Sequence, residues 1–205
     1  SGIGGILHIA SGYSRRFEEV ILQVPKGRSL KGINVSANRG QTTIINASLE
    51  NATLNTNGYL LRIEGSRIKN SKLTTPNIIN IFSTELTDSQ LESTEKHFHA
   101  EKIQVHGKVE LVAKTDLQLL LSEEEKQRIN LDLSTKHGSI LHFVREGRRS
   151  FNNKENKDER LSNPYKTEKA DAKDQLIARA DQDIYLLKSE EHESSSRNRL
   201  SLIHI

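Results

Sequence analysis

The chain lacks cysteine, methionine and tryptophan, and it has only four tyrosines and five phenylalanines among 205 residues. Without cysteine there is no disulfide, no thiol nucleophile and no zinc site with cysteine ligands. No apolar run approaches the roughly 20 residues that a membrane-crossing helix needs, so we expect no transmembrane segment. The chain starts with Ser1 instead of methionine, which is compatible with a removed signal segment or anchor.

The chain also lacks a large excess of either basic or acidic residues. Thirty lysines and arginines stand against 27 aspartates and glutamates, for a net charge of +3. Proteins that bind nucleic acid usually gather basic residues on one face, whereas both signs are interspersed here. We therefore expect no nucleic-acid partner. Apolar residues make up 34% of the chain, which is little for a globular enzyme but is typical of a narrow fold filled by aliphatic side chains.

The sequence does contain a short repeat. Three segments carry apolar residues at five-residue steps, and their copies recur after 19 and then 18 residues: Ile44, Leu49 and Leu54; Ile63, Ile68 and Leu73; Ile81, Leu86 and Leu91. A unit this short cannot bury its apolar side alone and must stack on its neighbours. Because apolar residues alternate with polar ones and many are β-branched, the units are predicted to be strands. We predict an all-β fold, a single-stranded parallel β-solenoid of the β-helix type.

Polar residues are predicted to form the corners between the strands. The pairs 51–52, 70–71 and 88–89 each follow the central apolar residue of a copy, and their Asn and Ser side chains are expected to form ladders along the axis. Asn38-Arg39-Gly40 and Asn57-Gly58 are predicted corners with positive φ, which Asn and Gly adopt at low cost.

The composition divides the chain into three parts. Residues 1–17 are Gly-rich and are predicted to be a flexible lead-in, 18–188 the solenoid, and 189–205 a polar tail that could end in a cap strand. Within the solenoid, 145–173 is predicted to be a long charged loop, because it has too few apolar residues to offset its ordering entropy. Strands at 175–180 and 183–188 follow, so the loop is an excursion from the last coil. Ser122 and Glu125 have capping-box spacing, which predicts a helix of one turn at most.

Several phrases resemble a known family. The residues are 24–35 with Asn38-Arg39-Gly40, then 55–61, 132–140 and 178–186, which approximate a phrase of a strand, a polar pair, a glycine and another strand. These phrases resemble the bacterial adhesin-like family of β-strand repeats, a domain of unknown function of cell-envelope proteins, over roughly 18–187. The expected glycine is missing at Gln182 and at Glu95-Lys96. The resemblance implies a right-handed solenoid at the bacterial surface or envelope, linked to attachment or envelope-stress sensing, and it assigns no catalytic residue.

Two sets of residues are candidates for a site. His97 and His99 are expected on one face of a strand with His106 on a nearby strand, which would suit a metal, although a solvated histidine face is the simpler interpretation. The basic residues of the predicted loop could meet an anionic polymer or another protein, because binding residues concentrate on loops held by a rigid scaffold: Arg145, Arg148, Arg149, Lys154, Lys157 and Arg160. Acidic residues interrupt this set, so a solvated loop is the alternative.

The repeat and the resemblance favour a non-enzymatic module that presents a rigid solenoid to an envelope protein or an anionic polymer, without a cofactor. The expected location is the bacterial cell surface or envelope, with the cytoplasm as the alternative. A structural protein that stacks end to end through uncapped terminal coils is the second hypothesis. A polysaccharide-active β-helix enzyme is the third, and it would need convergent carboxylates in a groove. Glu50, Asp88, Glu92 and Glu110 are expected to face solvent, but without pairing in neighbouring coils.

Overall fold

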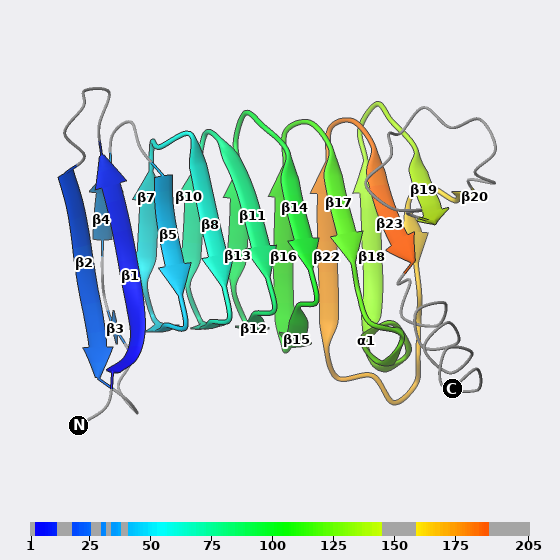
Figure 1. Cartoon of the computed structure of the whole chain (residues 1–205). Helices are drawn as coiled ribbons and strands as arrows, with labels where there is room; N and C mark the ends of the chain where they lie inside the picture. The colour runs from blue at the N-terminus through cyan, green and yellow to red at the C-terminus, as the bar shows by residue number, and fades with distance from the viewer. Residues whose placement is uncertain are drawn as a thin grey trace, which may run out of the picture.

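The computed structural model describes residues 3–11, 18–25, 30–31, 34–37, 41–144 and 159–188, with side chains for 41–142 and 159–188. These residues form an elongated stack of coils (Figure 1). The strands belong to three sheets, here called A, B and C, which contain ten, five and eight strands. The single helix in this part of the chain has six residues, and no helix there is long and apolar enough to cross a membrane.

Four consecutive coils each contribute one strand to sheet A, then one to sheet B and one to sheet C. The strands are β5 (Gln41–Ile45), β6 (Ser48–Glu50) and β7 (Thr53–Thr56); β8 (Leu60–Glu64), β9 (Arg67–Lys69) and β10 (Lys72–Thr75); β11 (Ile78–Phe82), β12 (Glu85–Thr87) and β13 (Gln90–Ser93); and β14 (Phe98–Glu101), β15 (Gln104–His106) and β16 (Lys108–Ala113). Neighbouring coils pair in parallel. The predicted parallel solenoid is therefore confirmed.

The repeated apolar residues form stacks inside the solenoid. The register pairs Ile44 with Ile63 in sheet A, and it pairs Leu49 with Ile68 in sheet B. All three residues of the second copy, Ile63, Ile68 and Leu73, are buried. Alternate residues along each strand point inward, so a repeat of aliphatic residues becomes one continuous core. Thus the period seen in the sequence is the length of one coil.

Two sharp corners in each coil are made by residues with positive φ. The corner from sheet A to B contains Asn46, Gly65, Ser83 and Lys102, and the corner from B to C contains Asn51, Asn70, Asp88 and Gly107. The expected ladders are present: Ala52 N–H donates to Ser71 Oγ (3.0 Å), and Ser71 N–H donates to Ser89 Oγ (3.1 Å). Each hydroxyl thus replaces a backbone partner that the turn removes.

The predicted positive φ at Asn57 and Gly58 is wrong. Their corner, from sheet C to sheet A, spans 57–59, and three residues can turn the chain without a left-handed conformation. Asn38-Arg39-Gly40, the other predicted corner of this kind, lies outside the described residues.

The predicted flexible lead-in is also wrong for most of its length. Residues Ile3–Ser11 form β1, which pairs antiparallel with β2 (Glu18–Pro25) and with β5. Backbone pairing with two neighbours outweighs the conformational freedom of the glycines. Two short strands, β3 (Leu30–Lys31) and β4 (Asn34–Ala37), continue sheets B and C in parallel. Sheet A therefore ends in an antiparallel hairpin at the N-terminal end (Figure 1).

The last coils are interleaved. The chain runs through β17 (Leu117–Leu120), α1 (Glu123–Arg128), β18 (Asn130–Thr135) and β19 (Ile140–Val144). Much later, β22 (Gln175–Ala180) inserts between β16 and β18, and β23 (Ile184–Lys188) inserts between β17 and β19 (Figure 1). The predicted return of strands after the charged segment is confirmed. Their insertion between earlier coils was not predicted.

Half of the predicted charged loop is an ordered cap. Two short strands, β20 (Glu159–Leu161) and β21 (Tyr165–Lys166), pair antiparallel with β19 and β18, and Leu161 and Tyr165 pack against the core. Asn163 completes the cap, since its side chain accepts from Thr135 N–H (3.1 Å) and donates to Thr135 O (3.3 Å). Backbone pairing orders this polar segment, and it closes strand edges that the second hypothesis expected to be open. Residues 145–158 and 189–205 lie outside the described part.

We expect Gly107→Ala to destabilise the protein by about 1–3 kcal/mol, because Gly107 has φ +66° and an added Cβ would lie 2.0 Å from Asp88 Oδ1. Ser83→Gly is the control, because Ser83 also has positive φ (47°) and glycine adopts this conformation at low cost. The free energy of unfolding in urea measures both effects. An unchanged midpoint for Gly107→Ala would contradict the corner geometry.

We expect Ala178→Asp, which buries a charge in β22, to remove hydrogen-exchange protection from β18 and β19 while 60–91 stay protected. The reason is that β18 pairs within its sheet only with β22 and β21. Ser134→Asp on the half-exposed side of β18 is the control. Retained protection of β18 in the Ala178 variant would show that the last coil does not depend on the inserted strands.

Candidate functional site

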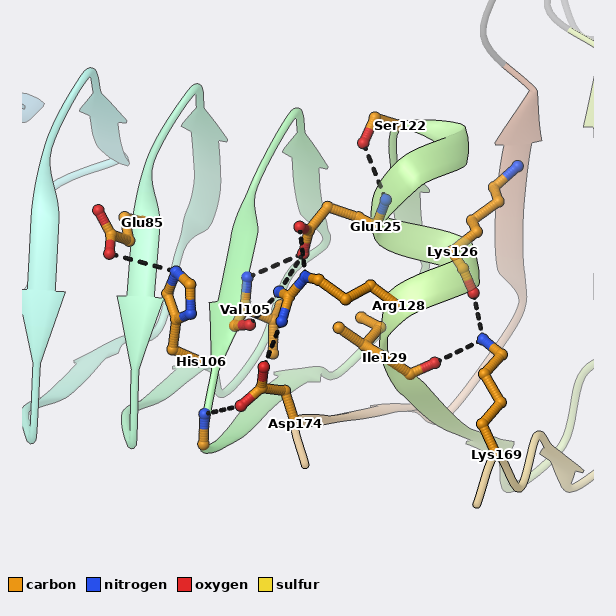
Figure 2. Close-up of polar contacts among 11 residues, drawn as sticks. Glu85, Val105, His106, Ser122, Glu125, Lys126, Arg128, Ile129, Lys169 and Asp174 are labelled. Atoms are coloured by element: carbon orange, nitrogen blue, oxygen red, sulfur yellow. Dashed lines mark hydrogen bonds and ion pairs between the residues drawn. The ribbon is translucent and has the colours of Figure 1, made fainter. Parts of the chain in front are cut away.

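Helix α1 lies where the next strand of sheet B would follow β15. The predicted cap is present, since Ser122 Oγ accepts a hydrogen bond from Glu125 N–H (3.1 Å), but the helix extends to six residues instead of one turn. The Glu125 carboxylate accepts from Val105 N–H at 3.1 Å. Figure 2 shows this carboxylate pointing from α1 toward β15. The side chain therefore takes the place of a strand partner.

Arg128 completes this substitute for a strand. Its guanidinium donates to Val105 O (2.5 Å) and to both oxygens of Glu125 (3.1 and 2.9 Å). Both backbone polar groups of Val105 thus have side-chain partners, and the edge of sheet B is closed without a further strand. The hydrogen bond with Glu125 outweighs burial and raises the pKa of Arg128.

Asp174 joins this cluster to the inserted strand β22. Its carboxylate accepts from Gly107 N–H (2.8 Å) and from Arg128. Burial alone would raise the pKa of Asp174, but these hydrogen bonds outweigh it and the pKa lies below its usual value. Lys169 holds the other side of α1, because its ammonium donates to Lys126 O and to Ile129 O (2.7 Å; Figure 2). Burial lowers the pKa of Lys169.

These contacts define a bracket, formed by Glu125, Arg128, Lys169 and Asp174, whose polar groups point at one another and at backbone groups. Glu125 is buried and its partner Arg128 is half-buried, and separating charges in such surroundings is expensive. We therefore assign the bracket to holding the last coils together, not to binding a ligand.

The structure does not bring the three candidate histidines together. His97 is exposed, and His99 lies on β14 in sheet A, where it contacts Glu101 Oε1 (2.6 Å) and Gln118 Oε1 (2.8 Å). His106 lies on β15 in sheet B and contacts Glu85 Oε1 (3.2 Å; Figure 2). Different sheets point their outer faces in different directions. Within the described residues no group of three metal-binding side chains is found.

Of the six basic loop residues, the structure describes Arg160 alone. It lies on β20 with an exposed side chain, and its backbone pairs with Leu141. The other five, Arg145, Arg148, Arg149, Lys154 and Lys157, lie outside the described residues. Their role as a binding set stays a prediction.

A hollow of about 520 Å³ lies on the outer face of sheet C, where β13, β16, β22 and β18 run side by side. Val112, which is half-buried, contributes apolar surface to it. A second hollow, of about 530 Å³, adjoins it along the corner from sheet B to sheet C and shares Gln90 and Glu110. Volumes of this size match binding sites for small molecules or short chain segments. We call the first of these the sheet C hollow.

Ion pairs line the sheet C hollow. Asp181 Oδ2 lies 2.9 Å from Lys114 Nζ, and Asp181 Oδ1 lies 3.5 Å from Lys136 Nζ. Arg179 Nη1 lies 3.0 Å from Glu110 Oε1. The hydrogen bond between Lys114 and Asp181 raises the pKa of Lys114 and lowers the pKa of Asp181. Both shifts favour the charged forms of Lys114 and Asp181 at neutral pH.

The cations of the sheet C hollow are its outermost charges. The side chains of Lys114, Lys136 and Arg179 are 57, 71 and 56% exposed, whereas those of Asp181 and Glu110 are 21 and 25% exposed. A molecule that approaches this face therefore meets lysine and arginine first. The carboxylates beneath them hold the cations in position.

Sequence reasoning missed this site because β22 comes from far along the chain. Glu110, Val112 and Lys114 stand at alternate positions in the sequence, which is a signal that side chains in an extended segment share a face. However, nothing local indicates that Arg179 and Asp181 lie beside them. Glu92 and Glu110 were expected to face solvent without forming a pair in neighbouring coils. Both line the sheet C hollow, but they are not directly opposite each other, since the register sets Gln90 opposite Glu110 and Glu92 opposite Val112.

We expect Asp174→Asn to lower the free energy of unfolding by about 1–3 kcal/mol at pH 7, because a charged partner of Arg128 is lost. The pKa of Asp174 is depressed in the folded chain, so its stabilisation is present above the unfolded pKa, about 3.9, and is lost as pH falls through the lower folded pKa. The gap between the two proteins should therefore close below about pH 4. Asp132→Asn controls for loss of one charge, and a gap independent of pH would contradict the assignment.

A family model described as Toastrack DUF4097 matches residues 4–187. The comparison with curated proteins and the comparison with solved structures return no match. The matched range includes nearly all of β1, the four regular coils, the bracket and nearly all of the inserted strand pair. The chain therefore belongs to the Toastrack DUF4097 family, a domain of unknown function.

Proposed function

We propose that the chain is a non-enzymatic interaction module that binds an acidic partner in the sheet C hollow. The observation that carries this proposal is the layering of charge, in which exposed lysine and arginine side chains stand above less exposed carboxylates. Arg179 is held by Glu110 beneath it, so this side chain is oriented before a partner arrives and less entropy is lost on binding. The partner is an envelope protein or an anionic polymer of the bacterial cell surface, as the resemblance to adhesin-like repeats implies.

The scaffold supports this role because it is built to stay rigid. Three of the strands beneath the sheet C hollow, β13, β16 and β22, pair on both sides within sheet C, and Leu91, Leu111 and Ala178 on their inner faces are buried. Side chains on such strands keep a fixed spacing of about 4.8 Å from coil to coil. A rigid row of charges favours recognition of a repeating or extended partner.

The alternatives have less support. Self-stacking through the C-terminal end would require open edges, but β20 and β21 cover sheets A and C there, and Glu125 and Arg128 bond the backbone of β15. A polysaccharide-active enzyme would need a carboxylate free to act as an acid or base. In the sheet C hollow Glu110 is paired with Arg179 and Asp181 with two lysines, which leaves Glu92 as a single carboxylate where glycoside hydrolysis uses two.

The test is a crosslinking pull-down from bacterial envelope extract with the charge-reversal variant Lys114→Glu/Lys136→Glu. We expect this variant to capture at least tenfold less of the partner than the unmodified chain does, because reversed charges repel an acidic surface. Lys69→Glu/Lys102→Glu carries the same change of net charge on sheet B and its corner, and it should capture normally.

Equal capture by both variants would remove the sheet C hollow as the site. Capture of nothing by the unmodified chain would count against the interaction module itself. A captured polysaccharide instead of a protein would identify which of the two partner classes is correct.

A further inference from the structure

Asp181 occupies the place in the sheet C hollow where an anionic group would bind best. Its two carboxylate oxygens are divided between two cations, Oδ2 to Lys114 and Oδ1 to Lys136. Lys114 follows β16 and Lys136 follows β18, so the two lysines come from strands on either side of β22. Those outer strands lie about 10 Å apart, twice the spacing of neighbouring strands, and Asp181 lies in the gap.

The backbone of Asp181 is fixed by hydrogen bonds, whereas its side chain is held by ion pairs. His137 N–H donates to Asp181 O (2.8 Å), Lys136 N–H donates to Ala180 O (3.1 Å) and Gln182 N–H donates to Thr115 O (3.1 Å). These bonds continue the pairing of the inserted strands around the corner. The carboxylate, in contrast, bonds within the described part of the chain only to two lysines that are more than half exposed. Ion pairs of this kind contribute little stability, so the carboxylate can rotate away at small cost.

We propose that Asp181 is a built-in competitor for the ligand: a carboxylate of the partner displaces it and takes its position between Lys114 and Lys136. This inference rests on the proposed function and names the chemistry of the site. An internal carboxylate has a high effective concentration at the two lysines, so it weakens binding of every external acid. Each ammonium carries three N–H donors, which allows the partner's carboxylate to be held by both lysines at once.

The surroundings favour a carboxylate on a peptide over one on a sugar. Val112 supplies apolar surface beside the lysines, whereas Ala113 and Ala180 are buried, and none of the described residues that line the sheet C hollow is aromatic. Sugar rings bind best on aromatic faces, whereas an extended peptide places every second side chain on one face. A peptide that alternates acidic and small residues would put carboxylates at the lysines and small side chains against Val112.

The test uses the full chain and a fluorescent capped peptide, acetyl-(Glu-Ala)4-amide, with binding followed by anisotropy at low salt. We expect Asp181→Asn to bind this peptide about two- to fivefold more tightly than the unmodified chain, because the competitor is gone. Glu92→Gln is the matched control. It removes the same charge from the same hollow, and it should change affinity less than Asp181→Asn does. Lys114→Ala in the Asp181→Asn background should abolish the gain.

Unchanged or weaker binding by Asp181→Asn, or an equal gain with Glu92→Gln, would overturn the competitor role even if the pull-down confirms the sheet C hollow as the site. Loss of capture by charge reversal would still support the proposed function in that case. Asp181→Ala serves as a second variant, and the hydrogen-exchange pattern of β22 checks that both variants fold. A gain seen with tetragalacturonate but not with the peptide would overturn the assignment to a peptide.

Discussion

Unpaired strand edges are the constraint on which the whole structure depends. Each coil presents rows of backbone N–H and C=O groups to the next coil, so stacking satisfies them everywhere except at the ends. At the C-terminal end the chain closes each sheet by a different device. Strand β20 pairs with sheet A, β21 and the Asn163 side chain cover sheet C, and Glu125 with Arg128 bonds Val105 in sheet B. In the last case two side chains copy the donor and acceptor of a missing strand.

The insertion of β22 and β23 connects this closure with the outer surface. Asp174, just before β22 begins, belongs to the bracket, and Asp181, just after β22 ends, lies between two lysines in the sheet C hollow. The same strand therefore fastens the end of the solenoid and completes the charged face. This explains why the candidate site is assembled from four separate stretches of chain, around Glu92, Glu110, Ser134 and Arg179.

The regular part of the fold could be predicted because its information is local. The 18- to 19-residue apolar period predicted the coils, and the polar pairs after Leu49, Ile68 and Leu86 predicted the ladders at one corner. The N-terminal strand β1 was missed because its glycines weaken the local strand signal, while pairing with β2 and β5 supplies the order. The cap at 159–173 was missed for the same reason. Its polar residues bury little surface, and backbone pairing to β18 and β19 orders them.

The sequence by itself determined the fold class, the coil length and the polar corners, since each of these depends on residues no more than about 20 positions apart. Only the tertiary structure decided where β22 and β23 lie, and with them the sheet C hollow. Their partners are distant in sequence, as the 67-residue separation of Gly107 and Asp174 shows. Any strand with alternating apolar residues can join a parallel sheet. The pattern therefore predicts that β22 is a strand, but it does not predict which coils lie on either side of it. The burial of Leu176 and Ala178 between two earlier coils settles that choice.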